Sequence, residues 1–294
     1  SNTTASYNTA VGKSALVVNT TGTSNVAVGK SALQSNTTAS CNTAVGKDSL
    51  PNNTTGNNNT SVGFGSQDAN TTGADNTSVG YMALAANTTS NDNTAVGKNA
   101  LSSNTTGSQN TAIGDQALQN NTTAADNTAC GRNALGENTT GIDNAAMGAY
   151  ALDACTTGRF NTAGGMHALG NLTTSDANTA LGRLAGHDVS TGANNTCIGH
   201  ESGRSNSPSG TITSGDNSIC LGNNNIQNLY CADTSISSSD KRDKTDVADF
   251  THGLNWINQL KPVTYRWDKR TWYDDNTPDG SKKRNKKHIG FLAQ

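Results

Sequence analysis

The sequence predicts an all-β protein in which 17-residue coils stack into a repetitive β-solenoid shaft, followed by a small C-terminal α+β segment. Three observations predict this: the chain is poor in large apolar side chains, one motif recurs at a fixed spacing, and the composition changes near residue 239. We expect a left-handed β-roll that forms a homotrimer, with an interwoven triple β-helix as the alternative. The predicted domains are the shaft over residues 1–202, an irregular capping coil and linker over 203–238, and a C-terminal domain over 239–294.

The composition argues against an ordinary globular core. Only 32% of the 294 residues are hydrophobic and 4% are aromatic, whereas a typical globular domain has more large apolar side chains. Such a chain is either disordered or a repeat protein with a thin core. A strict sequence period decides for the repeat protein.

A motif of the type Asn-Thr-Ala-Val-Gly returns every 17 residues without a slip, and a fixed period of this kind marks a stacked repeat architecture. An apolar residue precedes the glycine in most copies, an Ala-Leu pair follows it, and a second Asn opens an Asn-Thr-Thr-Gly turn. The motif glycines are Gly12, Gly29, Gly46, Gly63, Gly80, Gly97, Gly114, Gly131, Gly148, Gly165, Gly182 and Gly199.

Seventeen residues are too few for a helical hairpin, and they suit one coil with two short strands and two tight turns. Thr and Val favour strands, and Gly and Asn tolerate the positive φ of tight turns. Stacking places equivalent residues about 4.8 Å apart, so Asn side chains can form ladders and Val and Leu can form apolar stripes. Of the two stripes, one is expected to fill the solenoid and the other to face partner chains.

The register breaks after the last regular repeat, because Gly199 and Gly222 are 23 residues apart. The insert lies around residues 203–215. It is interpreted either as a loop in a degenerate capping coil or as a loop that contacts a receptor, since loops on rigid scaffolds often carry binding residues.

The repeat motif resembles the head repeats of trimeric autotransporter adhesins, which have a shorter period. The resemblance implies left-handed parallel β-rolls that trimerise side by side. Similar repeats occur in fibre proteins of phages and large viruses, which the chain also resembles.

The composition and charge of the sequence change at its C-terminal end. From Asp240 to Gln294 there are 12 Lys/Arg and 8 Asp/Glu, a balance of +4, which leaves −6 for the rest of a chain with net charge −2. Apolar residues at a spacing of three to four predict an amphipathic helix over Asp246–Leu260. Alternation predicts strands over Val263–Trp267 and His288–Ala293.

This segment resembles the intramolecular chaperone domain of phage tail spikes, tail fibres and endosialidases. The family opens with a Ser-Asp-x-Arg-x-x-Lys motif and continues with a helix, a Leu-x-Pro-Val-x-Tyr-x-Trp strand and a Gly-x-x-Ala-Gln strand. The matching residues are Ser239, Asp240, Arg242, Lys244, Leu260, Pro262, Val263, Tyr265, Trp267, Gly290, Ala293 and Gln294.

The resemblance implies a domain that trimerises, assists folding of the fibre and then cuts itself off. The cut maps to the Ser238–Ser239 bond, with Ser239 as nucleophile and Lys244 as base. A hydroxyl needs such a base, and desolvation allows a lysine to serve. Asp243 departs from the family's usual apolar residue and favours the charged amine. In the alternative interpretation, Ser239 caps a turn and Lys244 lies in solvent.

The function that follows is a structural and attachment protein: a tail or capsid fibre of a virion, assembled in the host cytoplasm. Its expected partners are further copies of itself, a glycan receptor on the host surface and other virion proteins. A bacterial trimeric surface adhesin and the stalk of a glycan depolymerase spike are the alternatives. The sequence opens in mid-repeat and stops inside a predicted strand, so we expect further residues at both ends.

No cofactor, nucleic-acid partner or membrane insertion is expected. The net charge is small, no apolar run approaches the roughly 18 residues of a membrane span, and the five histidines lack metal-ligand spacing. The six cysteines form no CxxC pair, and the first four occupy different slots of the repeat. We therefore expect reduced, buried thiols. The many Asn-x-Thr sequences are interpreted as turns rather than as glycosylation sites.

Overall fold

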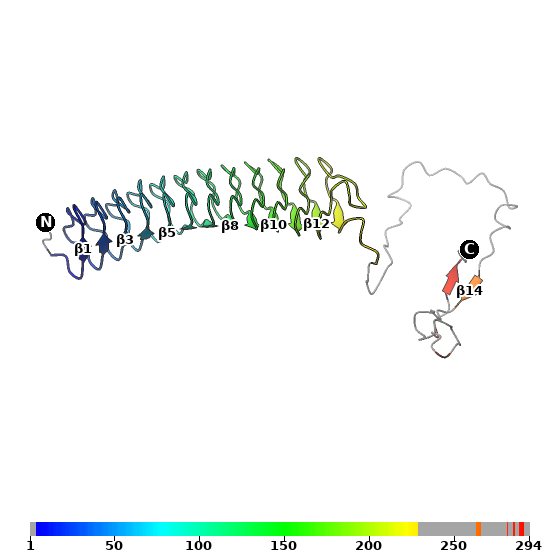
Figure 1. Cartoon of the computed structure of the whole chain (residues 1–294), viewed down its shortest axis with the longest axis horizontal. Helices are drawn as coiled ribbons and strands as arrows, with labels where there is room; N and C mark the ends of the chain where they lie inside the picture. Colours follow the sequence, from blue (N-terminus) through cyan, green and yellow to red (C-terminus); the bar gives the residue numbers. More distant parts are fainter. Residues whose placement is uncertain (1–3, 229–262, 266–280, 282–284, 286–287, 291–294) are drawn as a thin grey trace, which may run out of the picture. The chain divides into compact units, whose positions relative to one another are not determined.

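The computed structural model describes residues 4–228, 263–265, 281, 285 and 288–290. The chain divides into two compact units, Ser1–Leu229 and Tyr230–Gln294. The first unit is a parallel β-solenoid, drawn as successive coils from blue to yellow in Figure 1. This confirms the predicted all-β solenoid with 17-residue coils, whereas its handedness and the homotrimer stay predictions.

Each coil contributes one three-residue strand to a single 13-stranded sheet, in which consecutive strands pair in parallel from β1 to β13. The register advances by 17 residues from β1 to β12. The strands are β1 Thr9–Val11, β2 Val26–Val28, β3 Thr43–Val45, β4 Thr60–Val62, β5 Thr77–Val79, β6 Thr94–Val96, β7 Thr111–Ile113, β8 Thr128–Cys130, β9 Ala145–Met147, β10 Thr162–Gly164, β11 Thr179–Leu181, β12 Thr196–Ile198 and β13 Ile219–Leu221.

The motif glycine ends each strand for a steric reason. Gly97 has φ +138°, and a Cβ there would lie 2.3 Å from the carbonyl oxygen of Gly114 in the next coil. A side chain is thus excluded both by backbone conformation and by the close approach of the neighbouring coil. This requirement explains why the glycine recurs without exception in the twelve regular copies of the motif.

The prediction of two strands per coil was wrong. The Ala-Leu segment forms turns, because its leucines adopt left-handed backbone conformations that cannot continue an extended strand; Leu101, for example, has φ +53°. The leucines nevertheless point inward, and Leu33, Leu101 and Leu152 are fully buried. Of the two apolar stripes, the Ala-Leu stripe therefore fills the solenoid, and it does so from turns.

Two ladders of buried asparagines hold neighbouring coils in register. In the first ladder, the backbone N–H of Asn110 donates to Oδ1 of Asn93 (3.1 Å), and Nδ2 of Asn93 donates to the carbonyl of Gly107 (3.0 Å). In the second, Nδ2 of Asn121 donates to Oδ1 of Asn104 (2.9 Å). These side chains are fully buried. The asparagines of the second ladder open the Asn-x-Thr sequences, and Nδ2 of Asn104 closes such a turn by donating to the carbonyl of Gly107 (2.8 Å), which agrees with their interpretation as turns.

One coil interrupts the apolar core. Gln67 stands where the neighbouring coils carry leucine, and it is buried beside Ser61 and Ser78. Its Nε2 donates to Oγ of Ser78 (2.8 Å), but its Oε1 has no hydrogen-bond partner. The buried apolar residues accordingly fall into two clusters, one up to Leu50 and one from Ala83 onward.

Replacing Gln67 by leucine should stabilise the shaft. The substitution removes a buried carbonyl oxygen without a partner, which costs about 1–3 kcal/mol, and restores the leucine of the repeat. We expect the free energy of unfolding to rise by about 1 kcal/mol, measured by thermal or denaturant unfolding. Gln119→Leu, at a partly exposed position, serves as the control. A lower stability of the Gln67→Leu variant would contradict the argument.

The second unit is described only at a few residues. Strand β14 (Val263–Tyr265) pairs in antiparallel fashion with β15 (His288–Gly290), so that Val263 lies opposite Gly290 and Tyr265 opposite His288. The two strands predicted here, Val263–Trp267 and His288–Ala293, are therefore confirmed over their first three residues, and their remaining residues lie outside the described part of the chain. The helix predicted over Asp246–Leu260 lies outside the described residues.

Candidate functional site at the C-terminal end of the shaft

The insert packs back onto the shaft. Strand β13 stacks on β12 even though the connection is six residues longer than in the regular coils. The backbone N–H of Ile212 donates to the carbonyl of Gly203 (2.9 Å), and the Ile212 side chain is buried in the core. The hydroxyl of Ser207 donates to the carbonyl of Gly222 (3.2 Å). The insert thus closes the last coil instead of projecting freely.

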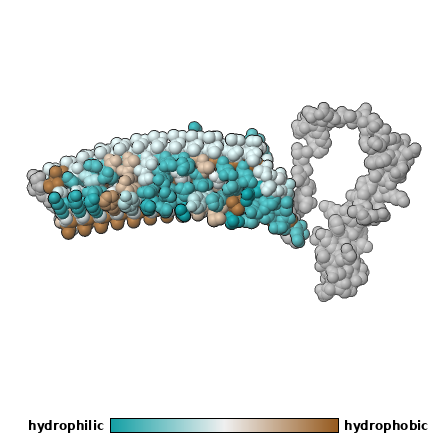
Figure 2. Space-filling model, turned by 45° about the horizontal axis from the view of Figure 1, so that its top comes forward, coloured by the Kyte–Doolittle hydropathy of each residue, from teal (hydrophilic) through white to brown (hydrophobic). Residues whose placement is uncertain are grey.

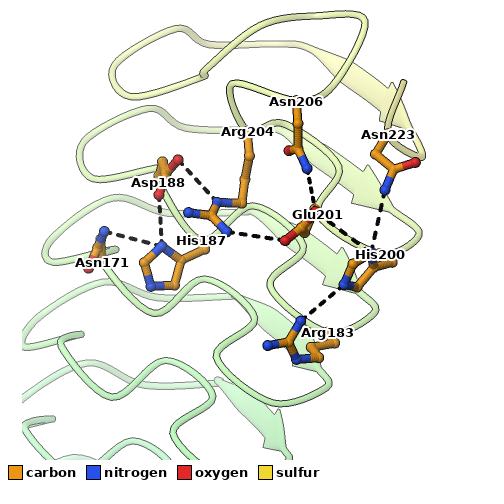
Figure 3. A network of polar contacts seen from close by, with 9 residues as sticks. All are labelled: Asn171, Arg183, His187, Asp188, His200, Glu201, Arg204, Asn206 and Asn223. Atoms are coloured by element: carbon orange, nitrogen blue, oxygen red, sulfur yellow. Dashed lines mark hydrogen bonds and ion pairs between the residues drawn. The ribbon is translucent and has the colours of Figure 1, made fainter. Parts of the chain in front are cut away.

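Charged and polar side chains join the insert to the coils before it, as Figure 3 shows. Arg204 is central: its Nε lies 3.2 Å from Oδ2 of Asp188, and its Nη1 lies 3.6 Å from Oε1 of Glu201. We call this group the end network. Its members are Asn171, Arg183, His187, Asp188, His200, Glu201, Arg204, Asn206 and Asn223.

Histidines extend the end network on both sides. His187 Nδ1 lies 2.7 Å from Oδ1 of Asp188, and His200 Nε2 lies 3.1 Å from a guanidinium nitrogen of Arg183. His200 Nδ1 also lies 3.8 Å from Oε2 of Glu201, so each of the two carboxylates lies near both a guanidinium and an imidazole. The side chains of Asp188 and Arg204 are only about a quarter exposed, so their interaction is less screened than that of a surface pair.

Asp188 shows the electrostatic effect of this arrangement. Burial alone would raise the pKa of its carboxyl group, but hydrogen bonds from His187 and Arg204, together with the positive charge of Arg204, outweigh burial and lower the pKa below 3.8. The ionised carboxylate is the form that these donors favour. Asp188 is consequently a stabilising contact between the insert and the preceding coil at neutral pH.

A line of rings leads from the shaft to the end network. The guanidinium of Arg132 lies 5.4 Å from the ring centre of Tyr150, and the Tyr150 ring stacks on His167 at 5.0 Å. His167 in turn meets His187 edge-on at 6.0 Å. Aromatic, imidazole and guanidinium groups therefore form one continuous surface over successive coils.

An apolar row runs along the outer face of the sheet. The third residue of each strand points outward, and Met147 in this row is 54% exposed. Figure 2 shows a brown line along the lower edge of the shaft, where Figure 1 places the strands. We call these residues the outer apolar row. It comprises Val11, Val28, Val45, Val62, Val79, Val96, Ile113, Cys130, Met147, Gly164, Leu181, Ile198 and Leu221.

The described residues were also compared with the requirements of a metal site and of a membrane-spanning helix. Among them, no set of three or more His, Cys, Asp or Glu side chains is arranged to hold a metal ion. Within the same part of the chain, no helix has the length and apolar character needed to cross a membrane.

Most of the predicted catalytic and motif residues lie outside the described residues. These are Ser238, Ser239, Asp240, Arg242, Lys244, Pro262, Trp267 and Gln294. Tyr265 and Gly290 are described, at the ends of the β14–β15 pair. The proposed nucleophile and base therefore stay predictions.

The prediction about cysteines was partly wrong. Cys155, Cys197 and Cys220 are buried and free, as expected, but Cys41 and Cys130 are exposed. Cys41 lies in a turn, and Cys130 belongs to the outer apolar row.

Sequence reasoning missed the end network. Its residues come from four successive coils when these are counted between the motif glycines, and no local motif joins them. The available signal was a loss of the repeat pattern, because His187, Asp188 and Arg204 occupy slots that hold small or amide residues in most earlier coils.

Comparison with known proteins supports the predicted resemblance of the C-terminal segment. Residues 239–294 match the model of the family described as chaperone of endosialidase. No curated protein and no solved structure gives a significant match to the chain. The family match begins at the serine that we interpret as the nucleophile.

Asp188→Asn should loosen the insert in a pH-dependent manner. Because its pKa is lowered on folding, Asp188 stabilises the shaft end above pH 3.8, and the contribution is lost as the pH falls through the folded-state value. A partly exposed ion pair contributes up to about 1 kcal/mol. We therefore expect roughly fivefold faster amide hydrogen exchange in residues 203–215 of the variant at pH 7.

The difference between the variant and the wild type should shrink toward acidic pH. Asp126→Asn, at an aspartate of an earlier coil outside the end network, is the matched control. Equal exchange in all three proteins at pH 7 would show that the end network does not hold the insert.

Proposed function

We propose that the chain is a structural and attachment protein of a virion, the shaft of a homotrimeric tail or capsid fibre that carries a self-cleaving chaperone at its C-terminal side. One observation carries this proposal: a parallel β-solenoid is followed in the same chain by a segment that matches the chaperone of endosialidase family. The solenoid gives the fibre its length and stiffness, and the chaperone segment assists the folding and trimerisation of the fibre.

The shaft suits the role of a spacer. Each coil is tied to the next by strand pairing and by the two asparagine ladders, so the solenoid resists bending between coils. A stack in which each coil contacts only its neighbours extends in one direction. Such a spacer holds a binding end away from the particle.

The homotrimer is supported by the outer apolar row. A row of this length leaves apolar area in contact with water, and burying it is favourable. A partner that fits must present apolar residues at the same spacing of about 4.8 Å per coil. A parallel second copy of the chain meets this requirement coil by coil, and three copies can arrange their rows around a common axis.

The C-terminal segment is proposed to cut the chain at Ser238–Ser239. In this mechanism the Ser239 hydroxyl adds to the carbonyl carbon of Ser238, and the neutral amine of Lys244 accepts the hydroxyl proton. The C–N bond between Ser238 and Ser239 then breaks as the Ser239 nitrogen takes up this proton, which leaves an ester between the Ser238 carbonyl and the Ser239 oxygen. Water hydrolyses the ester, giving a carboxylate at Ser238 and restoring the Ser239 hydroxyl. A lysine reaches its neutral form at moderate pH when burial lowers its pKa. The released product would end at Ser238.

The proposed ligand is a glycan on the host surface, contacted by the insert and the end network. These regions present guanidinium, imidazole, carboxylate and amide groups, and the Tyr150 ring is linked to them through His167. Such polar groups can hydrogen-bond sugar hydroxyls, and an aromatic ring can stack on a sugar face. Assembly is proposed to occur in the host cytoplasm, with the fibre then joining other virion proteins.

Ser239→Ala should abolish cleavage of the full-length gene product. The wild type is expected to give a shaft fragment whose mass corresponds to a C-terminus at Ser238, and the variant is expected to give one uncut band on a denaturing gel. Lys244→Ala should also remain uncut, because the hydroxyl loses its base. Ser237→Ala and Lys241→Ala are the neighbouring controls and should cleave normally. An uncut wild-type protein would refute autoproteolysis.

Met147→Arg should break the trimer. It places a charge in the outer apolar row, where burial without a partner is costly. Met166→Arg is the matched control, because Met166 is also exposed (40%) but lies outside the row. Sedimentation should give trimers for the wild type and for Met166→Arg, and smaller species for Met147→Arg. A wild-type monomer, or an intact Met147→Arg trimer, would refute this interface.

A further inference from the structure

Two cysteines meet inside the last coils of the shaft. Cys197 is the central residue of β12 and Cys220 is the central residue of β13, and the strand register places them directly opposite each other. Their exposed fractions are 1% and 3%. The 23-residue step of the insert creates this pairing, since regular 17-residue steps would leave the two residues in different slots.

The neighbouring residues make room for the sulfur atoms. Gly186 and Gly203 occupy the slot in which most other coils carry the core leucine. A Cβ added at Gly203 would lie 2.9 Å from Sγ of Cys197, and one added at Gly186 would lie 3.4 Å from it. The Cys197 sulfur thus fills space that leucine side chains occupy elsewhere in the shaft.

The separation suits a disulfide. Paired strands lie about 4.8 Å apart, within the Cα range of roughly 4.4–6.8 Å seen in disulfides. Both side chains are buried in the core, and the two thiols are close enough for Cys220 to contribute to raising the pKa of Cys197. No other pair of the described cysteines occupies opposite positions of paired strands.

We propose that Cys197 and Cys220 are a modification site that forms an intrachain disulfide when the protein meets an oxidising environment. The inference does not depend on the proposed trimer or on autoproteolysis. The bond would close a loop that contains the whole insert, and such cross-links stabilise by restricting the unfolded chain. The end of the shaft would thereby become locked after release from a reducing compartment.

The oxidant is a small-molecule disulfide such as glutathione disulfide. One protein thiolate attacks it, forming a mixed disulfide and releasing one glutathione thiol; the second protein thiolate then attacks the protein sulfur of the mixed disulfide and releases the other. In total, two protein thiols are oxidised and one small disulfide is reduced to two thiols. Burial, together with the neighbouring Cys220, raises the pKa of Cys197 to about 12, so oxidation should be slow.

The test is to incubate the purified full chain with glutathione disulfide, alkylate the remaining thiols in denaturant and map the peptides by mass spectrometry. Trypsin cuts after Arg204, between the two cysteines, and chymotrypsin cuts after Tyr230, which separates Cys220 from Cys231. We expect a cross-linked peptide pair joining Cys197 to Cys220 and lacking two hydrogen atoms relative to the free thiols.

The variants make the result specific. Cys197→Ser and Cys220→Ser should each lose the cross-link, whereas Cys155→Ser, at another buried cysteine, should retain it. Alkylation of both Cys197 and Cys220 after exposed Cys41 has become fully glutathionylated would overturn the proposal. A cross-link from either residue to a different cysteine would overturn it as well.

Discussion

The first asparagine ladder is the interaction on which the rest of the shaft depends. At each step, a buried Oδ1 accepts the backbone N–H of the equivalent asparagine in the next coil, and the Nδ2 group donates to a backbone carbonyl 14 residues further along, as Asn93 does toward Asn110 and Gly107. A buried amide without these partners would cost about 1–3 kcal/mol. The ladder fixes which residues of successive coils lie opposite each other, and it continues across the longer last coil, where the backbone N–H of Ser218 donates to Oδ1 of Asn195 (2.9 Å).

The second ladder is shorter and its end changes the interior. It runs through eight coils to Asn138, whose Oδ1 has no partner because the next coil carries Cys155 in this slot. Leu172 and Val189 follow, both fully buried. Beyond Asn138, one side of the interior therefore passes from hydrogen bonding to apolar packing. This apolar section leads into the coils that bear the end network and the insert.

Much of the shaft could be predicted because its information is periodic. The spacing of Gly97 and Gly114 gives the coil length, and the alternation of small inward and larger outward residues gives the sheet face. The second strand could not be predicted, because the sequence does not reveal that Leu101 adopts a left-handed conformation. A leucine that points inward from a turn and one that points inward from a strand give the same periodic sequence pattern, so the pattern does not distinguish the two.

The end of the shaft was harder to predict, because its contacts depend on an insert that departs from the 17-residue period. Arg204 meets Asp188 because the insert folds back, and no rule based on the 17-residue repeat contains that path. The pairing of Cys197 with Cys220 was accessible in principle, since the step from Gly199 to Gly222 is also 23 residues. The catalytic assignment rests on the family match alone, because Ser239 and Lys244 lie outside the described residues.

The regular coils and the last coils therefore differ in the residues that fill the interior of the solenoid. In the regular coils the inner slots hold the ladders and small core residues, and the outer apolar row is exposed on the other face of the sheet. In the last coils the residues in the inner slots change: Gly186 and Gly203 replace the leucines, and Cys197 and Cys220 replace the alanines. Because a thin core has little apolar area to stabilise its end, the final coils add polar contacts and a closely placed pair of thiols.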